Sequence, residues 1–161
     1  MMHLVVCAIL CLLSVATADC PEKCKCNKYK TSCWNSRLNG LPYGLDNSTE
    51  FVRVQNDHII ELNQDTVSQL PIGLKELQLI SILLQEIKNL TFKNMELLES
   101  LTITGNNINI LIAGTFKGLY MLHTLDLSQN HISNLKPGVF DGLTSLRHLN
   151  MSYNEIKILE T

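Results

Sequence analysis

The feature that most constrains the fold is a 24-residue unit that occurs three times in register in the second half of the chain. Each copy has the pattern Leu-x-x-Leu-x-apolar-x-x-Asn-x-Ile-x-x-Leu, in which x is any residue. The copies start at Leu98, Leu122 and Leu146. A fixed period of this length predicts that similar supersecondary units stack into a solenoid, because one unit alone cannot bury its apolar face.

Two less regular copies precede these three. One starts at Leu74 and has Ile82 at the asparagine position, and the other starts at Thr49 and has Asp57 there. The repeats therefore extend over 49–161, with starts near 49, 74, 98, 122 and 146, and the last copy is incomplete.

The residue types of the unit have a physical reason. Alternating apolar residues place every second side chain of a short strand in the core, and stacked strands then form a parallel sheet. An inward asparagine amide can bond backbone groups at the turn after each strand, so we expect a ladder of Asn106, Asn130 and Asn154. Ile82 breaks this ladder, which predicts a local irregularity or a water in place of the amide. An ionised Asp57 can accept hydrogen bonds but cannot donate them.

Four cysteines, Cys20, Cys24, Cys26 and Cys33, lie within fourteen residues. An even, clustered set in an oxidising compartment indicates disulfides. A Cys24–Cys26 bridge across one residue would be strained, which leaves sequential or crossed pairs. Zinc binding is the competing interpretation, but extracellular thiols oxidise more readily than they stay metallated.

Together, the repeats and the segment Cys20-Pro21-x-x-Cys24-x-Cys26-x6-Cys33 resemble extracellular leucine-rich repeat proteins with an N-terminal cysteine cap. The resemblance implies an α/β fold: a curved solenoid with a parallel concave sheet and a disulfide-bonded cap at 19–48, here without a C-terminal cap. It also implies the pairs Cys20–Cys26 and Cys24–Cys33. Similar proteins include ectodomains of Toll-like and other cell-surface receptors and secreted matrix or guidance proteins.

The first eighteen residues are typical of a secretory signal peptide. An apolar run too short to span a membrane is followed by the small residues Ala16-Thr17-Ala18. We therefore expect a secreted, extracellular protein, with no membrane span in this chain. Three N-x-S/T sequons, at Asn47, Asn89 and Asn150, fit a glycoprotein, although Asn150 is expected in the sheet, where close packing can hinder glycosylation.

Charge and motifs disfavour several classes of function. Thirteen Lys and Arg against fifteen Asp and Glu, with 6% aromatic residues, argue against a nucleic-acid binder. No glycine-rich phosphate loop precedes a helix, so no nucleotide or other cofactor is predicted. Asp126 and His148, expected on neighbouring strands, lack an associated nucleophile, so we predict no enzyme. These two residues and His123 do not share one row, so we predict no metal site.

The sequence therefore predicts a module that binds an extracellular protein or glycan on the concave face. The alternatives are a structural protein that self-associates through its uncapped last repeat and the N-terminal portion of a transmembrane receptor. The contact candidates are outward or adjacent residues, with aromatic residues and Arg the strongest anchors: Phe51, Arg53, Gln78, Thr102, Asp126, Arg147, His148 and Tyr153.

Overall fold

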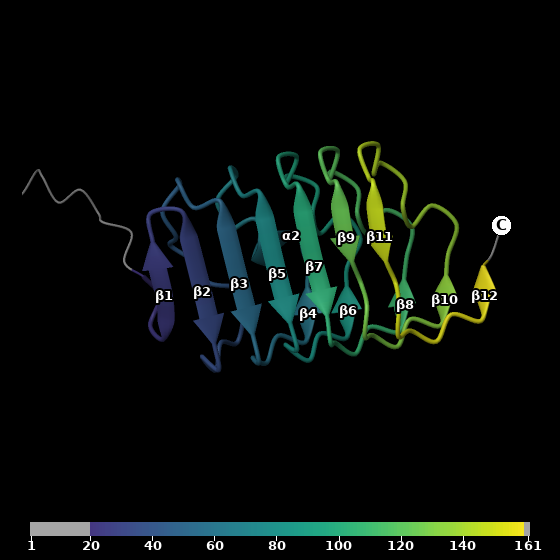
Figure 1. Cartoon of the computed structure of the whole chain (residues 1–161), viewed down its shortest axis with the longest axis horizontal. Helices are drawn as coiled ribbons and strands as arrows, with labels where there is room; N and C mark the ends of the chain where they lie inside the picture. The colour runs from purple at the N-terminus through teal and green to yellow at the C-terminus, as the bar shows by residue number, and fades with distance from the viewer. Residues whose placement is uncertain (1–19, 160–161) are drawn as a thin grey trace, which may run out of the picture.

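The structure, a computed structural model, describes residues 20–159. The predicted signal peptide at 1–18 lies outside the described residues. A seven-stranded sheet runs along the molecule: the cap contributes two strands and each repeat contributes one (Figure 1). In spatial order the strands are β1 (Cys24–Asn27), β2 (Lys30–Trp34), β3 (Phe51–Gln55), β5 (Glu76–Ile80), β7 (Ser100–Thr104), β9 (Thr124–Asp126) and β11 (His148–Asn150). The β1–β2 pair is antiparallel and every other pair is parallel.

The return segments of the coils lie on the opposite side and hold only short elements. Strands β8 (Ile110–Leu111), β10 (Asn134–Leu135) and β12 (Ile158–Leu159) form one small sheet, and β4 (Glu61–Leu62) pairs with β6 (Glu86–Ile87). The four-residue α2 (Gln64–Val67) is the one helix in the described part of the chain. The predicted curved leucine-rich repeat fold is confirmed, with the α component reduced to this single turn.

The core lies between the two sides and follows the predicted alternation. In β3, β5 and β7 the second and fourth residues are buried and the others are half-exposed. On the return side, Phe92, Phe116 and Phe140 stack in a column with ring centroids 6.2 Å apart. Each coil therefore packs its apolar residues on the equivalent residues of the next coil, as a solenoid requires.

The predicted asparagine ladder is present. Buried Asn106 makes four hydrogen bonds to backbone groups: its Oδ1 accepts from the N–H of Ile82 at 3.0 Å and of Leu84 at 3.2 Å. Its Nδ2 donates to the carbonyls of Leu79 and Thr104, both at 3.0 Å. The amide thus satisfies donors and acceptors that the turn would otherwise bury unpaired.

The next two coils use the same device. Asn130 Oδ1 accepts from the Ile108 N–H at 3.3 Å, and its Nδ2 donates to the Ile103 carbonyl at 2.8 Å. Asn154 Oδ1 accepts from the Ile132 N–H at 3.0 Å. Each asparagine therefore ties its own coil to the preceding one.

At Ile82 the irregularity is a change of backbone. The Ile59 N–H donates to the Ile82 carbonyl at 2.8 Å, so a main-chain oxygen takes the place of the missing amide oxygen. The next residue, Leu83, has φ of 62°, in the left-handed region that side chains other than glycine rarely adopt. A backbone carbonyl therefore accepts the hydrogen bond that an asparagine amide oxygen accepts in the later coils.

Asp57 fills its asparagine position incompletely. Its Oδ1 accepts from the Leu38 N–H at 2.9 Å, which ties the first repeat to the cap. Its Oδ2 is buried and has no hydrogen-bond partner among the described residues. In the three coils that have asparagine, the amide nitrogen at this position donates to a carbonyl of the preceding coil and to the carbonyl two residues earlier.

Close approach of neighbouring coils requires glycine at one position of the return side. Gly118 has φ of 106°, and a Cβ there would lie 2.6 Å from Lys93 Cα and from the Phe92 carbonyl oxygen. Both contacts are to backbone, which cannot move away cheaply. Gly142, the equivalent residue one coil later, has φ of 91° and its closest contact would be at 3.9 Å.

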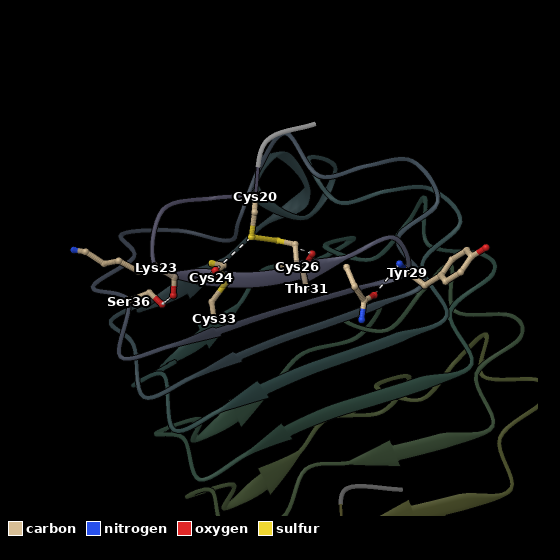
Figure 2. Close-up of a disulfide and its surroundings, with 9 residues drawn as sticks. Cys20, Lys23, Cys24, Cys26, Tyr29, Thr31, Cys33 and Ser36 are labelled. Atoms are coloured by element: carbon tan, nitrogen blue, oxygen red, sulfur yellow. Dashed lines mark hydrogen bonds between the residues drawn. A yellow bond between two sulfur atoms is a disulfide. The ribbon is translucent and has the colours of Figure 1, made fainter. Parts of the chain in front are cut away.

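The cap is held by two disulfides (Figure 2). Cys20 is bonded to Cys26, and Cys24 to Cys33, which is the crossed pairing that the resemblance implies. Cys33 is fully buried, so the second bond anchors β1 to the end of the core. The two cap strands continue the main sheet, because β2 pairs in parallel with β3.

Candidate ligand-binding surface

The outward side chains of the sheet form rows that run across the strands. Residues at equal register on neighbouring strands point to the same face, so the pairing fixes the members of each row. Row 1 is Asn27, Lys30, Phe51, Glu76, Ser100, Thr124 and His148. Row 2 is Lys25, Ser32, Arg53, Gln78, Thr102, Asp126 and Asn150. Row 3 contains Trp34, Gln55, Ile80 and Thr104.

A network of side chains orders the N-terminal part of these rows. Arg53 Nε donates to Gln78 Oε1 at 2.6 Å, and Gln78 Nε2 in turn donates to Glu76 Oε1. The Lys30 ammonium lies 4.2 Å from the centroid of the Phe51 ring, and the Arg53 guanidinium carbon lies 5.9 Å from it. Cations at these distances are attracted to the face of the ring.

A second network orders the C-terminal part. Asn150 Nδ2 donates to Asp126 Oδ2 at 3.1 Å, and the Ser128 N–H donates to Asp126 Oδ1 at 2.8 Å. Asn150 Oδ1 accepts from the N–H and hydroxyl of Ser152. His148 is exposed and lies in register with Thr124, one row away from Asp126.

The structure places six of the eight predicted contact residues in these rows. Arg147 precedes β11 and is exposed, and Tyr153 is 81% exposed in the turn after β11. These two residues therefore flank the sheet at its C-terminal end, while the other six span it from β3 to β11.

The sequence predicts a locally basic cap, through Lys23, Lys25, Lys28 and Lys30, with a solvated surface as the main interpretation and an anionic glycan or membrane contact as the alternative. It did not place any residue of the cap on this face. Lys25, Lys30 and Trp34 belong to the rows because β1 and β2 extend the sheet. The signal was present in the alternation of β2, where Thr31 and Cys33 are buried and the residues between and beside them face outward. Residues 19–48 are therefore both a cap and a part of the sheet face.

Ion pairs lie beside the rows, at the start of the strands and on the return side. Lys75 Nζ lies 2.9 Å from Glu50 Oε1, and this hydrogen bond raises the pKa of Lys75. Lys88 contacts Glu86 at 2.6 Å and Glu61 at 3.3 Å, and the bond to Glu86 is the main cause that raises the pKa of Lys88. These ion pairs involve none of the cations of the rows.

The residues that the structure describes bring together no group of three or more His, Cys, Asp or Glu that could hold a metal ion. In the same range, no helix has both the length and the apolar character needed to cross a membrane.

Comparison with known proteins agrees with this architecture. The leucine-rich repeat family profile matches residues 72–132 and 111–156, which together make up more than half of the chain. The chain belongs to the leucine-rich repeat family. A comparison with curated proteins found no match.

Among solved structures, the crystal structure of the TLR13–ssRNA13 complex is similar, with a TM-score of 0.73 and 33% sequence identity. The similar region covers 80% of this chain and 18% of the Toll-like receptor chain. The chain is thus a leucine-rich repeat domain like part of a Toll-like receptor ectodomain, and it spans less than a fifth of that receptor chain's length.

Proposed function

We propose that this chain is an extracellular ligand-binding module, secreted or displayed at the cell surface, that recognises a protein or glycan on the concave face. The observation that carries the proposal is the unbroken register of seven strands, which presents three rows of outward side chains on one rigid sheet. A preformed surface binds with little ordering cost, because its backbone is already fixed.

The predicted contact residues belong to this proposal. The hydrogen bonds that hold Arg53 to Gln78 and Asp126 to Asn150 restrict these side chains before any ligand arrives. Arg and aromatic residues supply most binding energy in protein interfaces, which favours Phe51 as a further anchor. The similarity to a Toll-like receptor supports a role in recognition, and the RNA in that complex makes RNA a necessary probe here.

Secretion and glycosylation are part of the same proposal. The signal at 1–18, the cap disulfides and the sequons at Asn47 and Asn89 all support an extracellular location. Asn150 is proposed to stay unmodified, because its amide already bonds Asp126 and Ser152 across the face. No catalytic role is proposed.

A glycan placed on the concave face tests the proposal even while the ligand is unidentified. Thr102→Asn creates a sequon with Thr104 in the centre of row 2. The matched control, Ala113→Asn, creates a sequon with Thr115 on the return side, one repeat after the natural sequon at Asn89. Because close packing in a strand can hinder glycosylation, mass spectrometry first identifies the fraction of each variant that carries the new glycan, and only that fraction is used.

The measurement is saturable binding of the labelled mature protein to cells of the producing organism, with unlabelled protein as competitor. We expect the Thr102→Asn glycan to abolish this binding and the Ala113→Asn glycan to leave it unchanged. Equal binding by both variants, or equal loss in both, would overturn the assignment to the concave face. Light scattering on the same samples detects the competing behaviour, which is self-association.

A further inference from the structure

The N-terminal end of the concave face combines two exposed lysines and a half-exposed arginine with an exposed tryptophan and a half-exposed phenylalanine. We define the basic–aromatic patch as the outward residues Lys25, Lys30, Trp34, Phe51 and Arg53 on β1, β2 and β3. We propose that this patch binds a polyanionic glycan chain, with sulfate or carboxylate groups on the three cations and a sugar ring against the tryptophan. The inference rests on the proposed function and names its ligand class.

The register of the cap strands brings the cations together. Lys25 lies directly opposite Ser32 in the antiparallel pair, and Ser32 lies beside Arg53 in the parallel pair. Lys25 and Arg53 are therefore two strands apart in row 2, about 10 Å by the usual strand spacing. Lys30 lies beside Phe51 in the adjacent row. A chain that crosses the strands meets a cation at regular intervals.

The charge of this region is one-sided. Residues 20–55 contain six Lys and Arg but three Asp and Glu. In the described structure the outward positions of β1, β2 and β3 include three cations and no acid, and the first outward acid is Glu76 on β5. Of the three acids, Glu50 pairs with Lys75, Asp46 accepts from Ser48, and Glu22 is exposed in the turn before β1. An anionic ligand would supply the missing counter-charge.

Two of the cations are already oriented. Lys30 is placed over the Phe51 ring at 4.2 Å, and Arg53 is held by the bond from its Nε to Gln78. That bond uses one of the five guanidinium N–H groups, so the outer edge of Arg53 can still donate to an anion. Restricting these long side chains in advance lowers the entropy cost of binding.

Trp34 distinguishes a glycan from a simple anion. Its side chain is 67% exposed beside Gln55 and half-exposed Ile80 in row 3. A large aromatic ring left in water is costly unless a partner covers it. A sugar ring has an apolar C–H face that packs on an aromatic ring, and its acidic substituents reach the cations. A flat lipid bilayer cannot enter a concave sheet, which disfavours a membrane as the partner.

The test measures affinity for immobilised heparin by surface plasmon resonance at about 150 mM NaCl. The neutral control is heparin that has been desulfated, N-acetylated and carboxyl-reduced, so that it carries neither sulfate nor carboxylate. The patch variant combines Lys25→Ala, Lys30→Ala and Arg53→Ala. The matched variant removes three exposed lysines from outside the rows: Lys93→Ala, Lys117→Ala and Lys157→Ala. Both variants lose the same net charge, so they differ in location, and circular dichroism checks that both are folded.

We expect the patch variant to lose at least about tenfold in heparin affinity, which is roughly twofold for each cation, while the matched variant changes little. Its dependence on salt should also weaken, because each cation removed releases about one counterion fewer. Trp34→Ala should weaken binding without changing the salt dependence. Equal losses in the two triple variants, or full affinity for the neutral heparin control, would overturn the inference.

Two other polyanions complete the experiment. Poly-glutamate and a single-stranded RNA oligonucleotide are tested as competitors at equal charge concentration. Stronger competition by either would reject a glycan in favour of an acidic protein segment or a nucleic acid. The Thr102→Asn variant, with its attached N-glycan, distinguishes the failure of this inference from the failure of the proposed function. If the N-glycan blocks binding to cells while the natural protein does not bind heparin, the inference fails and the proposed function stands. If heparin binds through the basic–aromatic patch while the N-glycan at position 102 leaves binding to cells unchanged, the proposed function fails.

Discussion

The asparagine ladder permits a reciprocal exchange, in which opposite substitutions in two coils, Asn to Asp in one and Asp to Asn in the other, have opposite effects on stability. Asn106→Asp retains an oxygen that accepts from Ile82 and Leu84, but it replaces the amide nitrogen that donates to two carbonyls at 3.0 Å. Asp57→Asn does the reverse, because it places a donor where a buried Oδ2 has no partner in the described structure.

The magnitudes follow from the bonds that are lost or gained. Asn106→Asp removes two hydrogen bonds worth about 1 kcal/mol each and leaves two buried carbonyls facing an acceptor, so we expect a total cost of about 3–5 kcal/mol. At roughly 4 °C per kcal/mol, the melting temperature falls by about 15 °C. Asp57→Asn gains one bond, worth about 1 kcal/mol. In the other coils this position donates to the carbonyl two residues earlier, which here belongs to Gln55.

Thermal and urea unfolding, followed by far-ultraviolet circular dichroism, measure both effects on the mature protein. Asn107→Asp is the control, since this neighbouring residue is exposed and undergoes the same chemical change. We expect the control to stay within about 0.5 kcal/mol of the natural protein. A cost below about 1 kcal/mol for Asn106→Asp, or a loss of stability for Asp57→Asn, would refute the assignment of donors and acceptors in the ladder.

The remaining predictions concern the return side and the cap. Gly142→Ala should cost about 1–2 kcal/mol for its left-handed backbone, and Gly118→Ala about 1–3 kcal/mol more because its Cβ meets backbone; equal costs by urea unfolding would contradict this. The hydroxyl and N–H of Ser48 both donate hydrogen bonds to Asp46, and these bonds lower the pKa of Asp46 from its ordinary 3.8. Ser48→Ala should therefore raise this pKa, and carboxyl NMR titration measures the change. Because the folded pKa is lowered, the stabilisation exists above the unfolded pKa and is lost as pH falls through the folded one. Thiol titration after unfolding without reductant should find no free thiol among the four cap cysteines.

Much of the repeat architecture could be predicted because its causes are local and periodic. The positions of Leu101, Leu125 and Asn106 in a 24-residue period determine which side chains enter the core and which amide bonds the turn. A solenoid repeats the same neighbour contacts, so one correctly interpreted unit predicts the others. The family resemblance added the disulfide pairing, which spacing alone left open.

What sequence could not predict depends on contacts between unlike segments. The Ile59 N–H can bond the Ile82 carbonyl only because Leu83 adopts a left-handed backbone conformation, and no residue pattern in the sequence predicts that conformation. The small helical content has a similar origin. Gly114, Gly118 and other residues with positive φ turn the return segments too often for a helix to propagate.

The rows separate recognition from stability along each strand. Inward residues such as Leu77, Leu101 and Leu125 are fully buried, whereas their neighbours in sequence face solvent and contact mainly one another. Large-to-small changes at the inward positions cost about 2–5 kcal/mol, while changes at outward positions usually cost about 0.5 kcal/mol or less. A loss of binding caused by an outward substitution can therefore be attributed to the surface itself. The cap obeys the same rule, because the Cys24–Cys33 bond holds β1 from the buried side and leaves Lys25 free to meet a ligand.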